Sequence, residues 1–89
     1  MIRRTLIVQN ALGIHTRAAA KLVDTAKQFE SDISLTYRKR TINCKSIMGV
    51  ITLGAQKDDS FDLEITGNDK EDALQAIEQL INNKFGEEA

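Results

Sequence analysis

The chain has 89 residues, of which 42% are hydrophobic and 28% charged, and its net charge at pH 7 is -1. This composition excludes a disordered chain, and a chain spanning 1–89 has room for one domain only. A net charge this close to zero does not supply the basic field that nucleic-acid binding requires. One cysteine and one histidine exclude an internal disulfide and the usual transition-metal sites, so we expect no metal and no cofactor.

Neither a membrane span nor a leader segment is predicted. The longest apolar runs, such as LIV and AAA, are far too short to cross a bilayer. The beginning of the chain, MIRRTLIVQN, contains two arginines but no apolar h-region, which argues against a signal peptide. We therefore expect the protein in the cytoplasm, without insertion into a membrane.

Strand and helix patterns alternate in the first half of the chain. Apolar and β-branched residues over 2–9 predict a strand, which the Asn-Ala-Leu-Gly run ends. From Thr16 to Phe29 an apolar stripe at helical spacing predicts an amphipathic helix. Period-two alternation from Asp32 to Arg38 predicts a second strand, and a tight turn at Lys39-Arg40 leads into a short strand from Thr41 to Cys44.

The second half continues with a short helix, a strand and a long helix. Ser46 to Leu53 is almost wholly apolar and lies between a good N-cap residue and a glycine, which predicts a short helix. Ser60 to Thr66 alternates cleanly and predicts a strand. Asn68 and Glu71 have the loose form of a capping box, and the apolar stripe that follows them predicts the long helix. The last residues, GEEA, are expected to fray.

The predicted order of elements is strand, helix, strand, strand, helix, strand, helix. Half-buried strands and helices with one apolar face each bury that face best by stacking in two layers. The sequence therefore predicts an α/β (α+β) two-layer, open-faced sandwich. In this fold three helices cover one face of a four-stranded, mainly antiparallel sheet.

The only histidine, His15, immediately precedes the first predicted helix. The first N–H groups of a helix have no partner within it, the helix dipole adds positive charge there, and Arg17 adds a guanidinium. Because these groups disfavour a charged imidazole, His15 should be neutral and able to act as a nucleophile. If it accepted a phosphoryl group, the helix N–H groups and Arg17 could donate hydrogen bonds to the phosphoryl oxygens. The alternative is a histidine that only caps the helix or lies in solvent.

The short helix and its first residues carry two further predictions. A helix of this length buries only one side, so some of Ile47, Met48 and Ile51 should remain exposed as a contact surface. The alternative is that the helix lies deeper in the domain. Ser46 is interpreted first as an N-cap, although phosphate would also be tolerated at a helix N-terminus. Cys44 is interpreted as a small core residue rather than a reactive thiol.

Two segments resemble those of a known family. The run LGIHTRAAA, residues 12–20, resembles the active-site segment of the histidine-containing phosphocarrier protein (HPr) family of the bacterial phosphotransferase system. The run KSIMGVITLG, residues 45–54, resembles that family's regulatory-serine segment. The separation of the two runs, the length and the order of elements match as well, so the resemblance covers essentially the whole chain.

The resemblance implies a phosphoryl carrier, which is not an enzyme because each half-reaction leaves it covalently changed. His15 would accept a phosphoryl group on Nδ1 from phosphorylated enzyme I, with help from Arg17, and pass it to an A-type enzyme II component. A kinase/phosphorylase would act on Ser46 as a regulatory site. The carrier is expected to be a monomer. The resemblance also implies a partner-binding surface, which consists of Thr16, Arg17, Ala20, Lys21, Ile47, Met48 and Ile51.

Ala18 departs from the family pattern, which usually has proline directly after the arginine. Alanine is a good helix former and supplies a backbone N–H that proline lacks, so the fold should survive and only the fine geometry of transfer is affected. The sequence leaves open whether the carrier serves sugar uptake, a nitrogen-related branch or a purely regulatory relay.

The rival interpretation is a small regulatory module that binds a ligand, a protein or RNA without phosphoryl transfer. Ferredoxin-like domains share part of the predicted order of elements. RNA-binding versions need aromatic residues on central strands and basic surroundings. This chain has one tyrosine, three phenylalanines and a negative net charge. A ligand-sensing domain would give no role to the Gly-Ile-His-Thr-Arg run.

Overall fold

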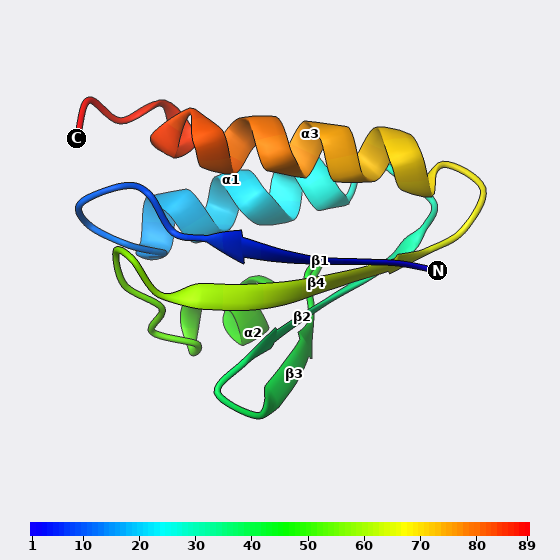
Figure 1. Cartoon of the computed structure of the whole chain (residues 1–89), viewed down its shortest axis with the longest axis horizontal. Coiled ribbons are helices and arrows are strands. Elements are labelled where there is room, and N and C mark those ends of the chain that lie inside the picture. Colours follow the sequence, from blue (N-terminus) through cyan, green and yellow to red (C-terminus); the bar gives the residue numbers. More distant parts are fainter.

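The elements follow the predicted order along the chain (Figure 1). The structure is a computed structural model that describes residues 1–89. Its elements are β1 (Ile2–Ile7), α1 (Thr16–Ala26), β2 (Asp32–Tyr37), β3 (Arg40–Asn43), α2 (Ile47–Ile51), β4 (Ser60–Thr66), α3 (Lys70–Asn82) and a final 3-10 turn, η1 (Lys84–Gly86).

The strands form one antiparallel sheet in the order β1-β4-β2-β3. In the register of the two central strands, Leu35 of β2 pairs with Leu63 of β4. The helices α1 and α3 lie side by side along the sheet (Figure 1), and α2 packs against α1 and β3. The predicted open-faced sandwich of a four-stranded sheet and three helices is confirmed, and the sheet is antiparallel throughout.

The core lies between the sheet and the helices. Alternate residues of the central strands are buried, and so is the predicted stripe of α1 except Phe29, which is half-buried. Burial of each large apolar side chain stabilises the fold by roughly 1.5–3 kcal/mol. The side chains that the central strands and α1 contribute are Ile33, Leu35, Tyr37, Phe61, Leu63, Ile65, Ala18, Ala19, Leu22, Val23 and Ala26.

The first helix is shorter than predicted. It ends at Ala26, because the N–H groups of Gln28 and Phe29 bond to carbonyls three residues back rather than four. Such bonds tighten the last turn and satisfy carbonyls that a helix end leaves without partners. Phe29 therefore packs against the core from the connection to β2, not from the helix.

The turn between β2 and β3 is one residue earlier than predicted. Arg38 and Lys39, not Lys39 and Arg40, form it, with φ angles of 49° and 69°. Two consecutive positive φ angles suit the right-handed twist of a two-residue hairpin. The sequence concealed this turn because neither position is glycine or asparagine. Cys44 lies just beyond β3 and is fully buried, and burial raises the pKa of its thiol to about 12, which agrees with a core role.

The predicted capping box before α3 is wrong. Asp69 occupies the N-cap position, and its side chain makes no bond to its own helix. Its carboxylate instead accepts hydrogen bonds from the N–H of Glu30 (2.8 Å) and from the N–H and hydroxyl of Ser31 (3.0 and 2.5 Å). These bonds, led by that of the Ser31 hydroxyl, lower the pKa of Asp69. The side chain therefore ties the start of α3 to the α1–β2 connection.

The loop before α1 rests on the segment that follows α2. The N–H of Ile14 donates to the carbonyl oxygen of Ala55 at 2.9 Å. Gly13 has a φ angle of 71°, and a Cβ at this position would lie 2.6 Å from the same oxygen. Only glycine suits both the left-handed backbone and this close approach. The loop thereby leads to the start of α1 along a defined path.

We expect Gly13→Ala to destabilise the protein more than the control variant Gly54→Ala. Both glycines have nearly the same φ, 71° and 70°, so each substitution carries a left-handed cost of roughly 1–2 kcal/mol. Only at Gly13 would the new Cβ meet backbone, whereas no atom lies within 4 Å of that built at Gly54. Urea unfolding of both variants measures the difference. Equal losses would show that the loop relaxes freely away from Ala55.

Candidate functional site

His15 caps the helix that it precedes. Its backbone is extended, with φ -86° and ψ -176°, and its Nδ1 accepts a hydrogen bond from the N–H of Arg17 at 3.3 Å. Its carbonyl accepts from the N–H of Ala19 at 2.7 Å, as an N-cap residue should. The predicted position at a helix N-terminus is confirmed. The capping role does not exclude a chemical role, because the atom that caps the helix, Nδ1, is also the ring nitrogen whose lone pair can react.

The second ring nitrogen of His15 contacts a residue that the sequence did not single out. Nε2 lies 2.5 Å from Oε2 of Glu87, and the two side chains are only 22% and 18% exposed. The hydrogen bond with His15 is the main cause that lowers the pKa of Glu87, so its carboxylate is ionised at neutral pH. The imidazole therefore has a hydrogen-bond partner on each side.

The last residues of the chain are docked on the domain, whereas the sequence predicted that they would fray. The N–H of Ala11 donates to the carbonyl of Ala89 at 2.9 Å, and Nδ2 of Asn10 donates to Oε1 of Glu87 at 3.1 Å. In Figure 1 the red end of the chain lies beside the blue loop between β1 and α1. The prediction failed because GEEA has no apolar periodicity, and its partners lie in a loop more than 70 positions away.

One protonation state of the imidazole satisfies both of its partners. A neutral ring with the proton on Nε2 donates to Glu87 and accepts from the Arg17 N–H at Nδ1. A charged ring would carry a proton on both nitrogens. The N–H of Nδ1 would then point at the N–H of Arg17, and neither group could accept a hydrogen bond. The hydrogen bonds thus assign the lone pair to Nδ1, the atom at the N-terminus of α1. The prediction of a neutral ring from the sequence was based on Arg17 and the helix dipole, and Glu87 was not identified as the partner of Nε2.

The cations near His15 have different surroundings. Arg17 is exposed, and its guanidinium makes no hydrogen bond within the protein. Lys21 donates through Nζ to the carbonyl of Phe85 at 2.6 Å, so its charge is engaged with the turn before the docked end. Both line a shallow depression of about 540 Å³ together with Leu12 and residues 86–89. The guanidinium is therefore the cation left free to meet an anion at this surface.

The short helix α2 presents part of its apolar surface to solvent, as predicted. Ile47 is 38% and Met48 66% exposed, while Ile51 is half-buried against the core and Val50 is fully buried. Ser46 is exposed, and its hydroxyl caps the helix by accepting from the N–H of Gly49 at 3.2 Å. Thr16 and Ala20 are exposed on the neighbouring helix α1. The structure thus leaves most of the predicted contact residues accessible.

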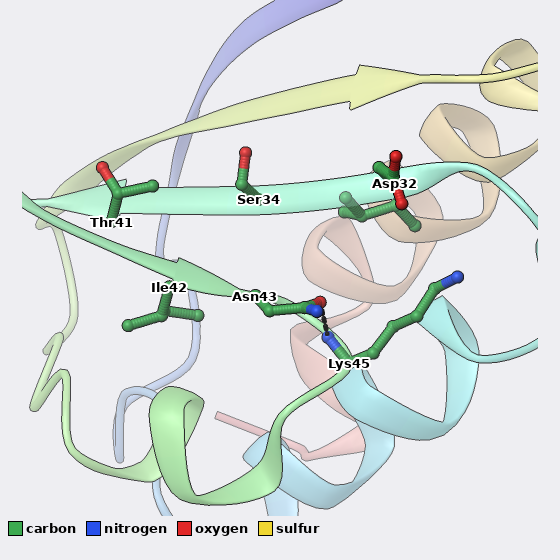
Figure 2. Close-up of a pocket in the computed structure, with 7 residues that line it drawn as sticks. Asp32, Ser34, Thr41, Ile42, Asn43 and Lys45 are labelled. Carbon is green, nitrogen blue, oxygen red and sulfur yellow. Dashed lines mark hydrogen bonds between the residues drawn. The ribbon is translucent and has the colours of Figure 1, made fainter.

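A second depression, of about 340 Å³, lies along β2 and β3 (Figure 2). Its lining includes Asp32, Ser34 and Lys45 but none of the predicted site residues. Lys45 is engaged there, because its N–H donates to Oδ1 of Asn43 and its Nζ to the carbonyl of Phe29. No cluster of three or more His, Cys, Asp and Glu side chains is placed to hold a metal ion. None of the helices has the length and apolar character needed to cross a membrane.

The comparisons with known proteins agree on one family. The family pattern described as "PTS HPr component phosphorylation site" matches residues 2–83. The phosphocarrier protein HPr of Xylella fastidiosa (strain 9a5c) is 43% identical over 88 residues, which cover 99% of each chain.

Two solved structures from Thermoanaerobacter tengcongensis share both fold and sequence with this chain, each at 39% identity. HPr-C-His superposes with a TM-score of 0.95 over 100% of both chains. The HPr dimer superposes with a TM-score of 0.78 over 98% of this chain and 100% of that one. The family pattern, the identity over nearly the whole length and the common fold show that this chain belongs to the HPr family of phosphoryl carriers of the phosphotransferase system.

Proposed function

We propose that Nδ1 of His15 accepts a phosphoryl group from phosphorylated enzyme I and passes it to an A-type enzyme II component. The observation that carries the proposal is the lone pair of Nδ1 at the N-terminus of α1, with the ring proton engaged on the opposite nitrogen. A helix N-terminus stabilises negative charge through its free N–H groups and its dipole. The nucleophile therefore lies where the oxygens of a phosphoryl group are stabilised best.

The transfer forms one bond to phosphorus and breaks another. The Nδ1 lone pair first loses its hydrogen bond from the Arg17 N–H. It then attacks phosphorus while the bond between phosphorus and the donor breaks, and the donor keeps that electron pair. The ring then carries a positive charge, and the phosphoryl oxygens face the first turn of α1 and the guanidinium of Arg17. Onward transfer reverses these changes, so His15 leaves as a neutral imidazole. The carrier returns to its first state only after both half-reactions.

We propose that partners dock on α1 and α2 around His15. The exposed Ile47 and Met48 supply an apolar centre, and Arg17 and Lys21 supply charge at its margin. Thr16, Ala20 and the half-buried Ile51 complete this docking surface. We place the carrier in the cytoplasm, and the free thiol of Cys44 fits a reducing compartment. Two solved relatives are described as dimers, so the monomeric state stays a prediction.

We expect His15→Ala to fold normally and to accept no phosphoryl group. His15 is the only histidine in the chain, and replacing it removes the capping atom but leaves the buried core unchanged. Incubation with enzyme I and labelled phosphoenolpyruvate tests this, with circular dichroism as the folding check. On wild type the label should be acid-labile and base-stable. Full labelling of the variant, or none on wild type, would contradict the proposal, and the second result would favour the rival binding module.

We expect Arg17→Ala to slow transfer about ten- to a hundredfold, because a charge-assisted contact to phosphate contributes roughly 1.5–3 kcal/mol. The melting temperature should hardly change, since the guanidinium makes no bond in the unphosphorylated protein. The matched control is Arg4→Ala, which removes an exposed arginine from β1. Equal transfer rates for both variants would rule out the role of Arg17.

We propose Ser46 as a regulatory phosphorylation site. The hydroxyl is exposed at the start of α2 and directly precedes Ile47 and Met48 of the docking surface. Phosphorylation would add about -1.5 to -2 charges there. The helix end tolerates this charge, but a donor that already carries an anionic phosphoryl group is repelled by it. The modification would thus act on the encounter with the partner and not on the fold.

We expect Ser46→Asp to accept phosphoryl groups more slowly than Ser46→Asn, by roughly fivefold at low salt, which corresponds to about 1 kcal/mol for one charge pair. Both side chains are good N-caps, so the pair differs in charge alone. Added salt should narrow the difference, because exposed charges are screened over about 8–10 Å. Rates from enzyme I, measured against salt, provide the test. If the two variants behave alike at low salt, Ser46 is a helix cap only.

A further inference from the structure

We propose that Glu87 is a positioning residue for phosphoryl transfer, which holds the ring proton of His15 on Nε2 and keeps the Nδ1 lone pair directed at the incoming phosphorus. This inference rests on the proposed function of His15. It concerns a residue outside both sequence motifs. Its starting observation is the 2.5 Å contact between Nε2 and Oε2 of Glu87.

The carboxylate of Glu87 is held from behind by a buried amide. Asn10 is fully buried, and its Nδ2 donates both to Oε1 of Glu87 (3.1 Å) and to the carbonyl of Gly13 (2.7 Å). Its own Oδ1 is buried without any partner. An unsatisfied buried acceptor destabilises the fold. The two hydrogen bonds that Nδ2 donates, to Glu87 and to Gly13, offset this cost and keep the amide in this orientation. The Asn10 amide thereby links the loop before His15 to the Glu87 carboxylate.

The backbone around Glu87 is also anchored. The N–H of Glu87 donates to the carbonyl of Lys84 at 2.9 Å. On one side of Glu87, Lys21 binds the carbonyl of Phe85, and on the other, Ala11 binds the carbonyl of Ala89. A side chain fixed by its neighbours on both sides orients its partner more firmly than a solvated one does. These contacts mark Glu87 as an organised partner of the ring.

The charges around the ring are arranged for the phosphorylated state. The Arg17 N–H and the helix dipole act at Nδ1, and the Arg17 charge also stabilises the Glu87 carboxylate. When Nδ1 takes the phosphoryl group, the ring becomes positive and Glu87 is its directly bonded counter-charge. The carboxylate repels the phosphoryl oxygens less strongly than it attracts the charged ring, because these oxygens lie at the opposite nitrogen and the repulsion weakens with distance. In catalytic triads a carboxylate likewise fixes the tautomer of a histidine and stabilises its charged form.

The inference predicts a defect in transfer rate without a defect in docking. Glu87→Gln, which removes the charge but keeps the shape, should lower kcat of enzyme I for the carrier about tenfold and leave KM unchanged. Glu87→Ala should lower kcat about ten- to a hundredfold. Glu30→Gln is the matched control, because it removes an equal charge from an exposed residue beyond the opposite end of α1 and should stay within about twofold of wild type.

A second measurement reads the contact without any transfer. In the wild type and in Glu30→Gln, the Nε2 proton of His15 should give a resolved NMR signal, since its hydrogen bond to Glu87 slows exchange with water. Glu87→Ala should lose this signal while its amide spectrum stays folded. An unchanged signal in Glu87→Ala, or a kcat of Glu87→Gln equal to that of Glu30→Gln, would overturn the inference.

The two measurements separate failure of this inference from failure of the proposed function. If wild type accepts no phosphoryl group from enzyme I, the proposed function fails and the inference fails with it, whatever the NMR signal. If wild type accepts the group and both Glu87 variants do so at the wild-type kcat, His15 keeps its role and only the role of Glu87 is refuted.

Discussion

The imidazole of His15 is held between two hydrogen bonds, and the organisation of the site depends on this arrangement. One partner is the N–H of Arg17 at the start of α1, and the other is the carboxylate of Glu87 from the last residues of the chain. Together they accept only the neutral ring with its proton on Nε2. A nucleophile for phosphorus needs this lone pair at the end of the ring where the helix stabilises negative charge.

The rest of the fold keeps these two partners in place. The buried stripe of α1 anchors the helix on the sheet, so the N–H of Arg17 has a defined direction. Gly13 brings the preceding loop onto the backbone at Ala55, and Asn10 joins that loop to Glu87. Both contacts bring main chain or a buried amide close to its partner. Because the interior is closely packed, a displacement at either contact would also shift the imidazole of His15.

The same helices carry the docking surface that we propose for the partners. Ile47 and Met48 keep apolar area in solvent, although α2 itself is anchored by the buried Val50. Ser46 caps this helix, so a charge introduced there leaves the helix end intact and still changes the electrostatic field at the docking surface. In the proposed function, fold stability and partner affinity are thereby separable, which suits a carrier that binds a donor and then an acceptor.

Hydrophobic periodicity in the sequence determined the element order, the buried faces and the open-faced sandwich, because these depend on residues close together in the chain. The Gly-Ile-His-Thr-Arg run likewise placed His15 at a helix N-terminus. The turn at Arg38 and the Asp69 carboxylate escaped prediction, since one lacks its usual glycine and the other serves a loop 38 residues away. Only the tertiary structure brought Glu87 to His15, because a carboxylate in a polar segment reveals its partner only when the chain has folded and the two ends of the molecule meet.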